Sequence, residues 1–112
     1  MRRYRTFVTA LTLGTLGWAA ARSPSTAGPA DPSRIEVKDF MFVPMSLTVK
    51  AGSTVTWTNR DDEPHTVVSD TKVFRSAALD TNESFSFKFD QPGTYHFSCS
   101  IHPRMVGTIV VQ

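Results

Sequence analysis

The chain has 112 residues and a formal net charge of +2. This length fits one small domain, and a basic balance taken alone would suggest nucleic acid or an anionic membrane as a partner. The charge is unevenly placed, however. Four arginines and no acid stand in the first 22 residues, whereas residues 31–112 hold eight basic and ten acidic side chains, a net charge of −2. The larger part of the chain is weakly acidic, so nucleic-acid binding loses its support.

The N-terminal segment has the pattern of a secretory signal. Three arginines precede an uncharged stretch of 16 residues at 6–21, and small residues follow. Threonines and glycines dilute the stretch, which is shorter than the ~20 apolar residues of a membrane span. We predict a signal peptide at 1–27 with cleavage between 21 and 30, a flexible linker at 28–33, and export to the periplasm with no stable membrane span after cleavage. An uncleaved anchor is the alternative.

Beyond this segment, apolar and polar residues alternate with a period of two, which is typical of β-strands with one buried face. The expected strands, in chain order, are 34–39, 45–50, 54–58, 65–69, 84–89, 94–99 and 107–111. Clusters of Gly, Pro, Asp and Asn separate them, and no window has a helical period. We therefore predict an all-β domain at 34–112, a Greek-key sandwich or barrel of about seven to eight strands.

One short loop carries residues with distinctive chemistry. Cys99, His102 and Met105 have the spacing C-x2-H-x2-M, and His65 stands 34 residues before the cysteine, after a turn. One thiolate, two imidazoles and a weak axial thioether are the ligands of a blue-copper electron-transfer site. Cys99 is also the only cysteine, so no disulfide can form within the chain. A copper thiolate would explain an unpaired cysteine in an exported protein.

Each of these residues also has a plainer interpretation. Cys99 continues the inward phase of its strand and could be a small buried hydrophobic residue. Met105 could belong to the core, and either histidine could lie at the surface. The four residue types together, at loop positions of one small β domain, favour a single copper ion. Zinc fits less well because its sites rarely use a thioether, and the single cysteine excludes a binuclear copper centre with two bridging cysteines.

Other polar or sulfur-containing residues are expected to lie away from the metal. His96 is in the opposite strand phase to Cys99 and should face solvent. Met41 and Met45 are interpreted as core or edge packing. The acids at 61–63 precede His65 in sequence, but a cluster of acids in a turn is usually solvated.

The sequence around these residues resembles that of a known family. The shared pattern comprises Val55-Thr-Trp-Thr-Asn59, Pro64-His65-Thr66-Val67, Phe85-x-Phe87-x-Phe89, Pro92-Gly93-Thr94-Tyr95 and Cys99-x2-His102-Pro103-x-Met105-x-Gly107. Across residues 34–112 the chain resembles the small type 1 copper proteins, the cupredoxins, and most closely the amicyanin group. Plastocyanins and pseudoazurins share most of the pattern but have more residues between the last histidine and the methionine.

The resemblance implies a role for each residue of the site. His65, Cys99 and His102 would be the equatorial ligands of one type 1 copper, with both histidines binding through Nδ1, and Met105 would be the long axial ligand. His102 would present its outer ring edge to the surface as the electron exit. Asn59 would tie the two ligand loops together and donate polarity near the Cys99 sulfur; the alternative is that Asn59 is only a turn residue at a strand end.

The resemblance further implies a soluble, monomeric one-electron carrier that is not an enzyme. Its partners would be redox proteins, of the kind of a c-type cytochrome and a quinone-cofactor dehydrogenase. Four protein ligands would close the copper site and leave no position for a substrate. A periplasmic module for copper delivery or sequestration, and a metal-free interaction domain, are the alternatives.

Three positions depart from the family pattern. Thr66 stands where the family often has asparagine, which alters the network that pins the ligand loops. Ile101 replaces a proline, and Arg104 replaces the aromatic residue usual before the methionine. The surface around His102 therefore gains a positive charge, and we expect a partner with an acidic docking face.

Overall fold

The computed structural model describes Gly14 and residues 33–112. The expected signal peptide and linker fall outside this part, apart from Gly14 and Ser33. The domain from residue 33 onward consists of strands and loops without a helix, and no described helix is long and apolar enough to cross a membrane. The strands are β1 (Arg34–Lys38), β2 (Met41–Val43), β3 (Ser46–Val49), β4 (Ser53–Asn59), β5 (Val68–Ser69), β6 (Ser84–Phe89), β7 (Gly93–Ser98) and β8 (Val106–Val111). The all-β prediction is confirmed.

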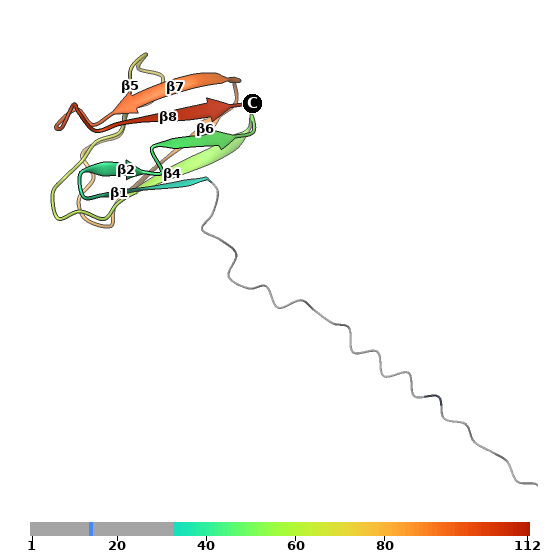
Figure 1. Cartoon of the computed structure of the whole chain (residues 1–112), viewed down its shortest axis with the longest axis horizontal. Helices are drawn as coiled ribbons and strands as arrows, with labels where there is room; N and C mark the ends of the chain where they lie inside the picture. Colours follow the sequence, from blue (N-terminus) through green and yellow to red (C-terminus); the bar gives the residue numbers. More distant parts are fainter. Residues whose placement is uncertain (1–13, 15–32) are drawn as a thin grey trace, which may run out of the picture.

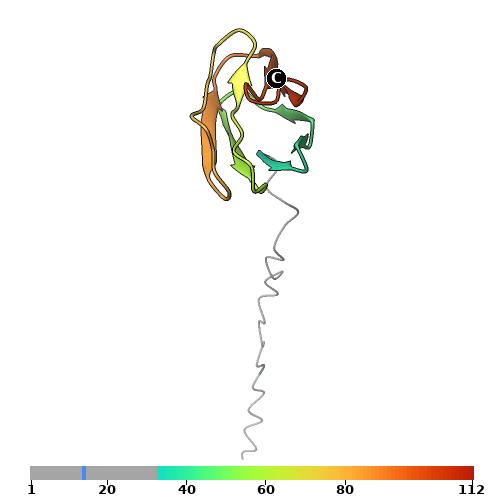
Figure 2. The ribbon, with the colours of Figure 1, turned by 90° about the vertical axis from the view of Figure 1, so that its left-hand side faces the viewer.

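The strands form two four-stranded sheets, with the orders β2-β1-β4-β6 and β3-β8-β7-β5 (Figures 1 and 2). β1 pairs in parallel with β4, and β3 pairs in parallel with β8, whereas the other pairs are antiparallel. The chain changes sheet after β2, β3, β4, β5 and β6. This repeated crossing gives the sandwich its Greek-key-like connectivity and brings the segments that follow β4 and β7 to the same end of the domain.

The core follows from the period of two. Inward-facing Trp57 on β4 and Phe97 on β7 are fully buried and meet edge to face, with ring centroids 5.4 Å apart. Phe74 and Phe89 also pack against Trp57, at 5.5 and 6.4 Å. Gly107 on β8 lies opposite Phe97 in register, and a Cβ at Gly107 would overlap the phenyl ring. The missing side chain thus makes room for an aromatic core residue two positions before Cys99.

Two features of the fold differ from the expected strands. β2 was not predicted, because it has only three residues and a single buried side chain, that of Phe42. The strand expected at 65–69 is reduced to β5. His65 instead forms an isolated bridge with Leu79, with N–O distances of 3.1 and 2.7 Å in the two directions. The backbone at His65 is therefore satisfied by the irregular segment before β6 rather than by a neighbouring strand.

Candidate metal centre

Three of the four predicted ligands come together at one end of the sandwich. The ligand atoms of His65, Cys99 and His102 all lie within 4.8 Å of one another. The sulfur of Cys99 is 3.8 Å from Nδ1 of His65 and 3.9 Å from Nδ1 of His102. His65 and Cys99 are fully buried, whereas His102 is half-buried. Both imidazoles thus turn the same nitrogen toward the thiol.

The loop between β7 and β8 is closed by its own backbone. The amide of Cys99 donates to the carbonyl of Met105 at 3.1 Å, and the amide of Met105 donates to the carbonyl of His102 at 2.9 Å. Cys99 directly follows β7, and Met105 directly precedes β8. Met105, the fourth predicted ligand, is 5% exposed and lines the same surface groove as His102. The spacing C-x2-H-x2-M therefore corresponds to one short loop between two paired strands.

The environment of Cys99 favours its thiolate form. The amide of Thr66 donates to the sulfur at 3.3 Å. Burial raises the pKa of the Cys99 thiol, but the hydrogen bond from the Thr66 backbone and the polar contacts with the His65 and His102 rings lower it more, so that the pKa falls from 9.0 to about 6. The thiolate, which is the form that binds metal, therefore predominates at neutral pH.

Thr66 also joins the two ligand-bearing loops. Its hydroxyl accepts a hydrogen bond from the amide of Ser100 and bonds to the Ser100 hydroxyl, both at 2.7 Å. Because Thr66 follows His65 and Ser100 follows Cys99, this contact fixes the two ligands relative to each other. Thr66 therefore supplies a contact that pins the two ligand loops together, at a position where the family often has asparagine.

Asn59 has a different role from the expected one. Its Nδ2 donates to the carbonyls of Glu63 and Leu79, each at 2.8 Å, and its Oδ1 accepts from the amide of Asp61 at 2.9 Å. Both amide hydrogens are thus used by these carbonyls rather than by the Cys99 sulfur. The fully buried Asn59 holds the turn before the first histidine and ties it to the segment before β6, not to the loop of the cysteine.

Asp61 is a residue of the site that the sequence did not reveal. Its side chain is only 11% exposed, and its Oδ2 lies 2.8 Å from Nε2 of His65. Because a carboxylate only accepts, Nε2 carries the ring hydrogen, and the lone pair of Nδ1 faces Cys99. Burial raises the pKa of Asp61, but hydrogen bonds from the amides of Phe40 and Asp39 and from His65 lower it more, to below its usual 3.8.

Asp62 and Glu63 are exposed, so the prediction that the acids at 61–63 are solvated holds for these two and fails for Asp61. The available signal was the spacing of four residues between an acid and a candidate ligand. That spacing becomes informative only when the turn around Pro64 brings the two side chains together.

The donors present fit one copper ion. A buried thiolate and two imidazole nitrogens converge, and a buried methionine lies at the end of the same loop. Soft sulfur ligands combined with imidazoles are the set that copper prefers, whereas zinc sites are completed by further cysteine, histidine or carboxylate ligands. The nearby carboxylate of Asp61 is bonded to the far side of the His65 ring, so it is a support of the donor set and not a member of it.

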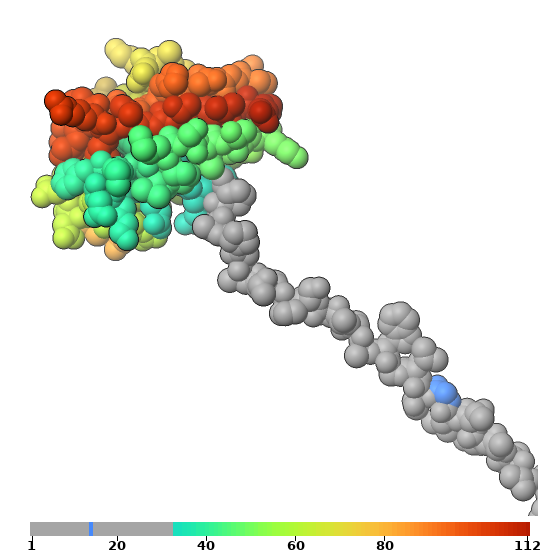
Figure 3. All heavy atoms as spheres, in the orientation of Figure 1, coloured from blue at the N-terminus to red at the C-terminus, as the bar shows by residue number. Residues whose placement is uncertain are grey.

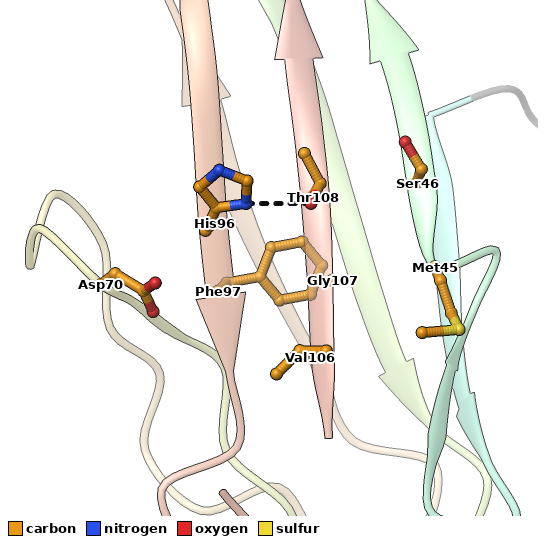
Figure 4. A pocket seen from close by; sticks show the side chains of 8 residues that line it. All are labelled: Met45, Ser46, Asp70, His96, Phe97, Val106, Gly107 and Thr108. Atoms are coloured by element: carbon orange, nitrogen blue, oxygen red, sulfur yellow. Dashed lines mark hydrogen bonds between the residues drawn. The ribbon is translucent and has the colours of Figure 1, made fainter. Parts of the chain in front are cut away.

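His96 lies away from the donors, as predicted. It is exposed on the outer face of the second sheet, where its Nδ1 is 3.1 Å from Oγ1 of Thr108 (Figure 4). It lines a shallow pocket of about 360 Å³ together with Asp70 and Met45. Met41 and Met45 are 50% and 54% exposed. These methionines therefore lie at the edges of the sheets and not in the core.

Comparisons of this chain with a family model and with known proteins agree on one family. The family model of the cupredoxin-like domain matches residues 9–111. The chain is 34% identical to amicyanin-alpha of Methylorubrum extorquens over 99 residues, which cover 84% of this chain and 83% of that protein. It is 42% identical to plastocyanin of Scenedesmus fuscus over 86 residues, which cover 65% of this chain and 88% of that protein.

Solved structures show the same similarity. A purple cupredoxin from Nitrosopumilus maritimus superposes with a TM-score of 0.68 at 32% identity, over 71% of this chain and 99% of that one. The Cu(I) form of an amicyanin variant superposes with a TM-score of 0.67 at 32% identity, over 77% of this chain and 88% of that one. The fold thus has counterparts among solved cupredoxins.

Proposed function

The chain belongs to the cupredoxin-like family and has a type 1 copper site, and we propose that it is an exported, soluble carrier of single electrons between redox proteins. The observation that carries this proposal is the convergence of one thiol sulfur and one ring nitrogen from each of two histidines within 4.8 Å. Copper bound by such a set exchanges one electron between Cu(II) and Cu(I). A protein that holds the donors in place keeps the rearrangement between the two states small.

We assign the ligands as the sequence suggested. His65 and His102 would bind through Nδ1 and Cys99 through its sulfur, with Met105 as the weak axial ligand. Four ligands from the protein leave no open position at which a substrate could bind, which favours an electron carrier over an enzyme. The residues around the ligands support this role by fixing the donors before the metal binds, through the hydrogen bonds of Thr66 and Asp61 described above.

The electron route favoured by the structure passes through His102. Its ring is half-buried, whereas the ring of His65 is fully buried. His102 lines a groove of about 410 Å³ together with Phe40, Ile101, Pro103 and Arg104. Besides His102 itself, the lining is apolar apart from one cation, Arg104. We infer a redox protein with an apolar contact surface and an acidic rim as the partner, because complementary charge speeds the encounter.

We further propose that residues 1–27 are a signal peptide, that 28–33 are a linker, and that the domain at 34–112 works as a monomer in the periplasm. The arrangement of arginines, apolar stretch and small residues supports this proposal. The mass and N-terminal sequence of protein recovered from a periplasmic fraction would test it, and size-exclusion chromatography would test the monomer. A retained N-terminus in a membrane fraction would show that the segment is an anchor.

The optical spectrum and the voltammetry of the Cu(II)-loaded protein test the proposed function. We expect an intense blue thiolate-to-copper absorption and a reversible Cu(II)/Cu(I) couple. Cys99→Ser should abolish the colour, whereas the control His96→Ala should keep it, because His96 lies on the outer sheet face. A colourless wild type with unchanged thermal stability would indicate a metal-free interaction domain. Copper that passes to an acceptor protein without a reversible couple would indicate copper delivery.

A further inference from the structure

We propose that Asp61 is a positioning residue of the copper site, which couples the ring orientation of His65 to the placement of Phe40 over both imidazoles. The inference rests on the proposed function, because it concerns how the donors of that site are held. The turn between β1 and β2, which carries Phe40, was not among the predicted parts of the site.

One carboxylate collects three hydrogen bonds from two separate parts of the chain. Oδ1 of Asp61 accepts from the amide of Asp39 at 2.7 Å, and Oδ2 accepts from the amide of Phe40 at 3.0 Å and from Nε2 of His65 at 2.8 Å. Asp61 is itself fixed through its backbone. Its amide donates to Asn59 at 2.9 Å, and its carbonyl accepts from Thr81 at 2.7 Å. The carboxylate is therefore a rigid link between the β1–β2 turn and the first histidine.

The turn that Asp61 holds has an unusual backbone. Asp39 and Phe40 are consecutive residues with positive φ values of 53° and 58°. A bulky side chain such as that of Phe rarely adopts this left-handed conformation unless its surroundings impose it. Both amides of the turn point into the same carboxylate. We conclude that Asp61 is the group that keeps Phe40 in this conformation.

The conformation places the Phe40 ring against both imidazoles. The ring centroid lies 5.3 Å from that of His65 and 5.0 Å from that of His102, with interplanar angles of 85° and 80°. The ring is 46% exposed. In the space-filling view, the β1–β2 turn adjoins the β7–β8 loop at one end of the molecule (Figure 3). Phe40 therefore shields the two histidines from solvent and restricts the rotation of both rings.

Removal of the carboxylate and removal of the ring should have different consequences. In Asp61→Asn, the single side-chain oxygen cannot accept all three hydrogen bonds, so both the His65 ring and the turn lose support. In Phe40→Leu, only the aromatic wall is lost, and the bond from His65 to Asp61 remains. The negative charge also makes His65 a stronger donor to Cu(II), so its loss should raise the reduction potential.

The experiment uses Asp61→Asn, Phe40→Leu and the double variant that carries both changes. The control is Asp62→Asn, which removes an exposed acid one position away. Imidazole nitrogen chemical shifts of the metal-free protein report the His65 tautomer. We expect Asp61→Asn to give mixed tautomers, about 10- to 100-fold weaker Cu(II) binding and a higher potential. Phe40→Leu should keep the tautomer but change the electron paramagnetic resonance spectrum of the Cu(II) form. In the double variant this spectrum should match that of Asp61→Asn, because the two changes are coupled.

Two results would overturn the inference. If Asp61→Asn behaves like Asp62→Asn in tautomer and potential, Asp61 does not position His65. If the spectral changes of the two single variants add fully in the double variant, Asp61 does not act through Phe40. Should Asp61→Asn fail to fold, an unchanged Cu(II) spectrum in Phe40→Leu would by itself refute the role of the ring. A failure of the proposed function would instead show in the wild type, as the absence of a reversible copper couple.

Discussion

The hydroxyl of Thr66 lies 2.7 Å from both the backbone nitrogen and Oγ of Ser100. The two residues directly follow His65 and Cys99 in the chain, so the bond between them sets the distance between two ligands from different loops. The donor atoms converge within 4.8 Å through contacts of this kind, which do not involve a metal. The chain thus holds the donors close together through its own hydrogen bonds.

Thr66→Val tests the contribution of this hydroxyl. Valine keeps the shape of the side chain and leaves the amide of residue 66 free to donate to Cys99. We expect the free energy of unfolding of the metal-free protein to fall by about 1–2 kcal/mol, because the amide of Ser100 loses its partner. The control Thr48→Val, on the exposed side of β3, should have a much smaller effect. Denaturant unfolding measures both, and equal losses would contradict the special role of Thr66.

A second prediction concerns the pH dependence of the metal-free protein. The pKa of Cys99 is lowered from 9.0 to about 6 in the folded state. Folding therefore favours the thiolate, and its contribution to stability is complete above pH 9.0, diminishes as the pH falls, and is lost near pH 6. Cys99→Ser should remove this part of the pH dependence. Thiolate absorbance should titrate near pH 6, and a midpoint near pH 9.0 would show that the hydrogen bonds do not act on the sulfur.

The fold was predictable from the sequence where side chains alternate regularly. Phe97 and Cys99 share one face of a strand because the period of two fixes their side, and the structure buries both. β2 could not be predicted in the same way. Its single buried residue, Phe42, gives no alternation to recognise, and the strand exists because it pairs with β1 over three residues. Regular strands can thus be predicted from the local sequence, whereas a short edge strand such as β2 depends on the strand with which it pairs.

The candidate metal site shows the same difference between features that are local in the sequence and features that depend on distant segments. The ligand types were evident because a thiol, two imidazoles and a thioether have few joint explanations. The supports were not evident, because they depend on distant chain segments. Asp61 stands in a polar turn, and only the folded β1–β2 turn brings two amides to its carboxylate. Asn59 was expected near Cys99, but the carbonyl of Glu63 in its own turn and the carbonyl of Leu79 before β6 take both of its hydrogens.

Met105→Gln tests the axial ligand. The amide oxygen of glutamine stabilises Cu(II) more than a thioether does, so we expect the blue colour to persist while the reduction potential falls. The matched control is Met45→Gln, because Met45 is 54% exposed and lines a pocket on the outer sheet face. Voltammetry of the three proteins measures the effect. A potential that does not fall in Met105→Gln, or that falls equally in the control, would argue against Met105 as a ligand.

Arg104→Glu tests the docking surface. Arg104 is the one charged side chain lining the groove at His102, so reversing its charge should change encounters at this point more than elsewhere. Oxidation by the hexacyanoferrate(III) anion, which mimics an acidic partner, should slow by about 10-fold or more at low ionic strength. The difference should shrink as added salt shortens the screening length.

Lys50→Glu is the control. It makes the same change in net charge in the turn between β3 and β4, whose backbone bonds to the C-terminal residue at the far end of β8. If both variants slow the reaction equally, the protein responds to net charge alone, and the local docking role of Arg104 is wrong. A slower reaction confined to Arg104→Glu would place the electron exit at His102.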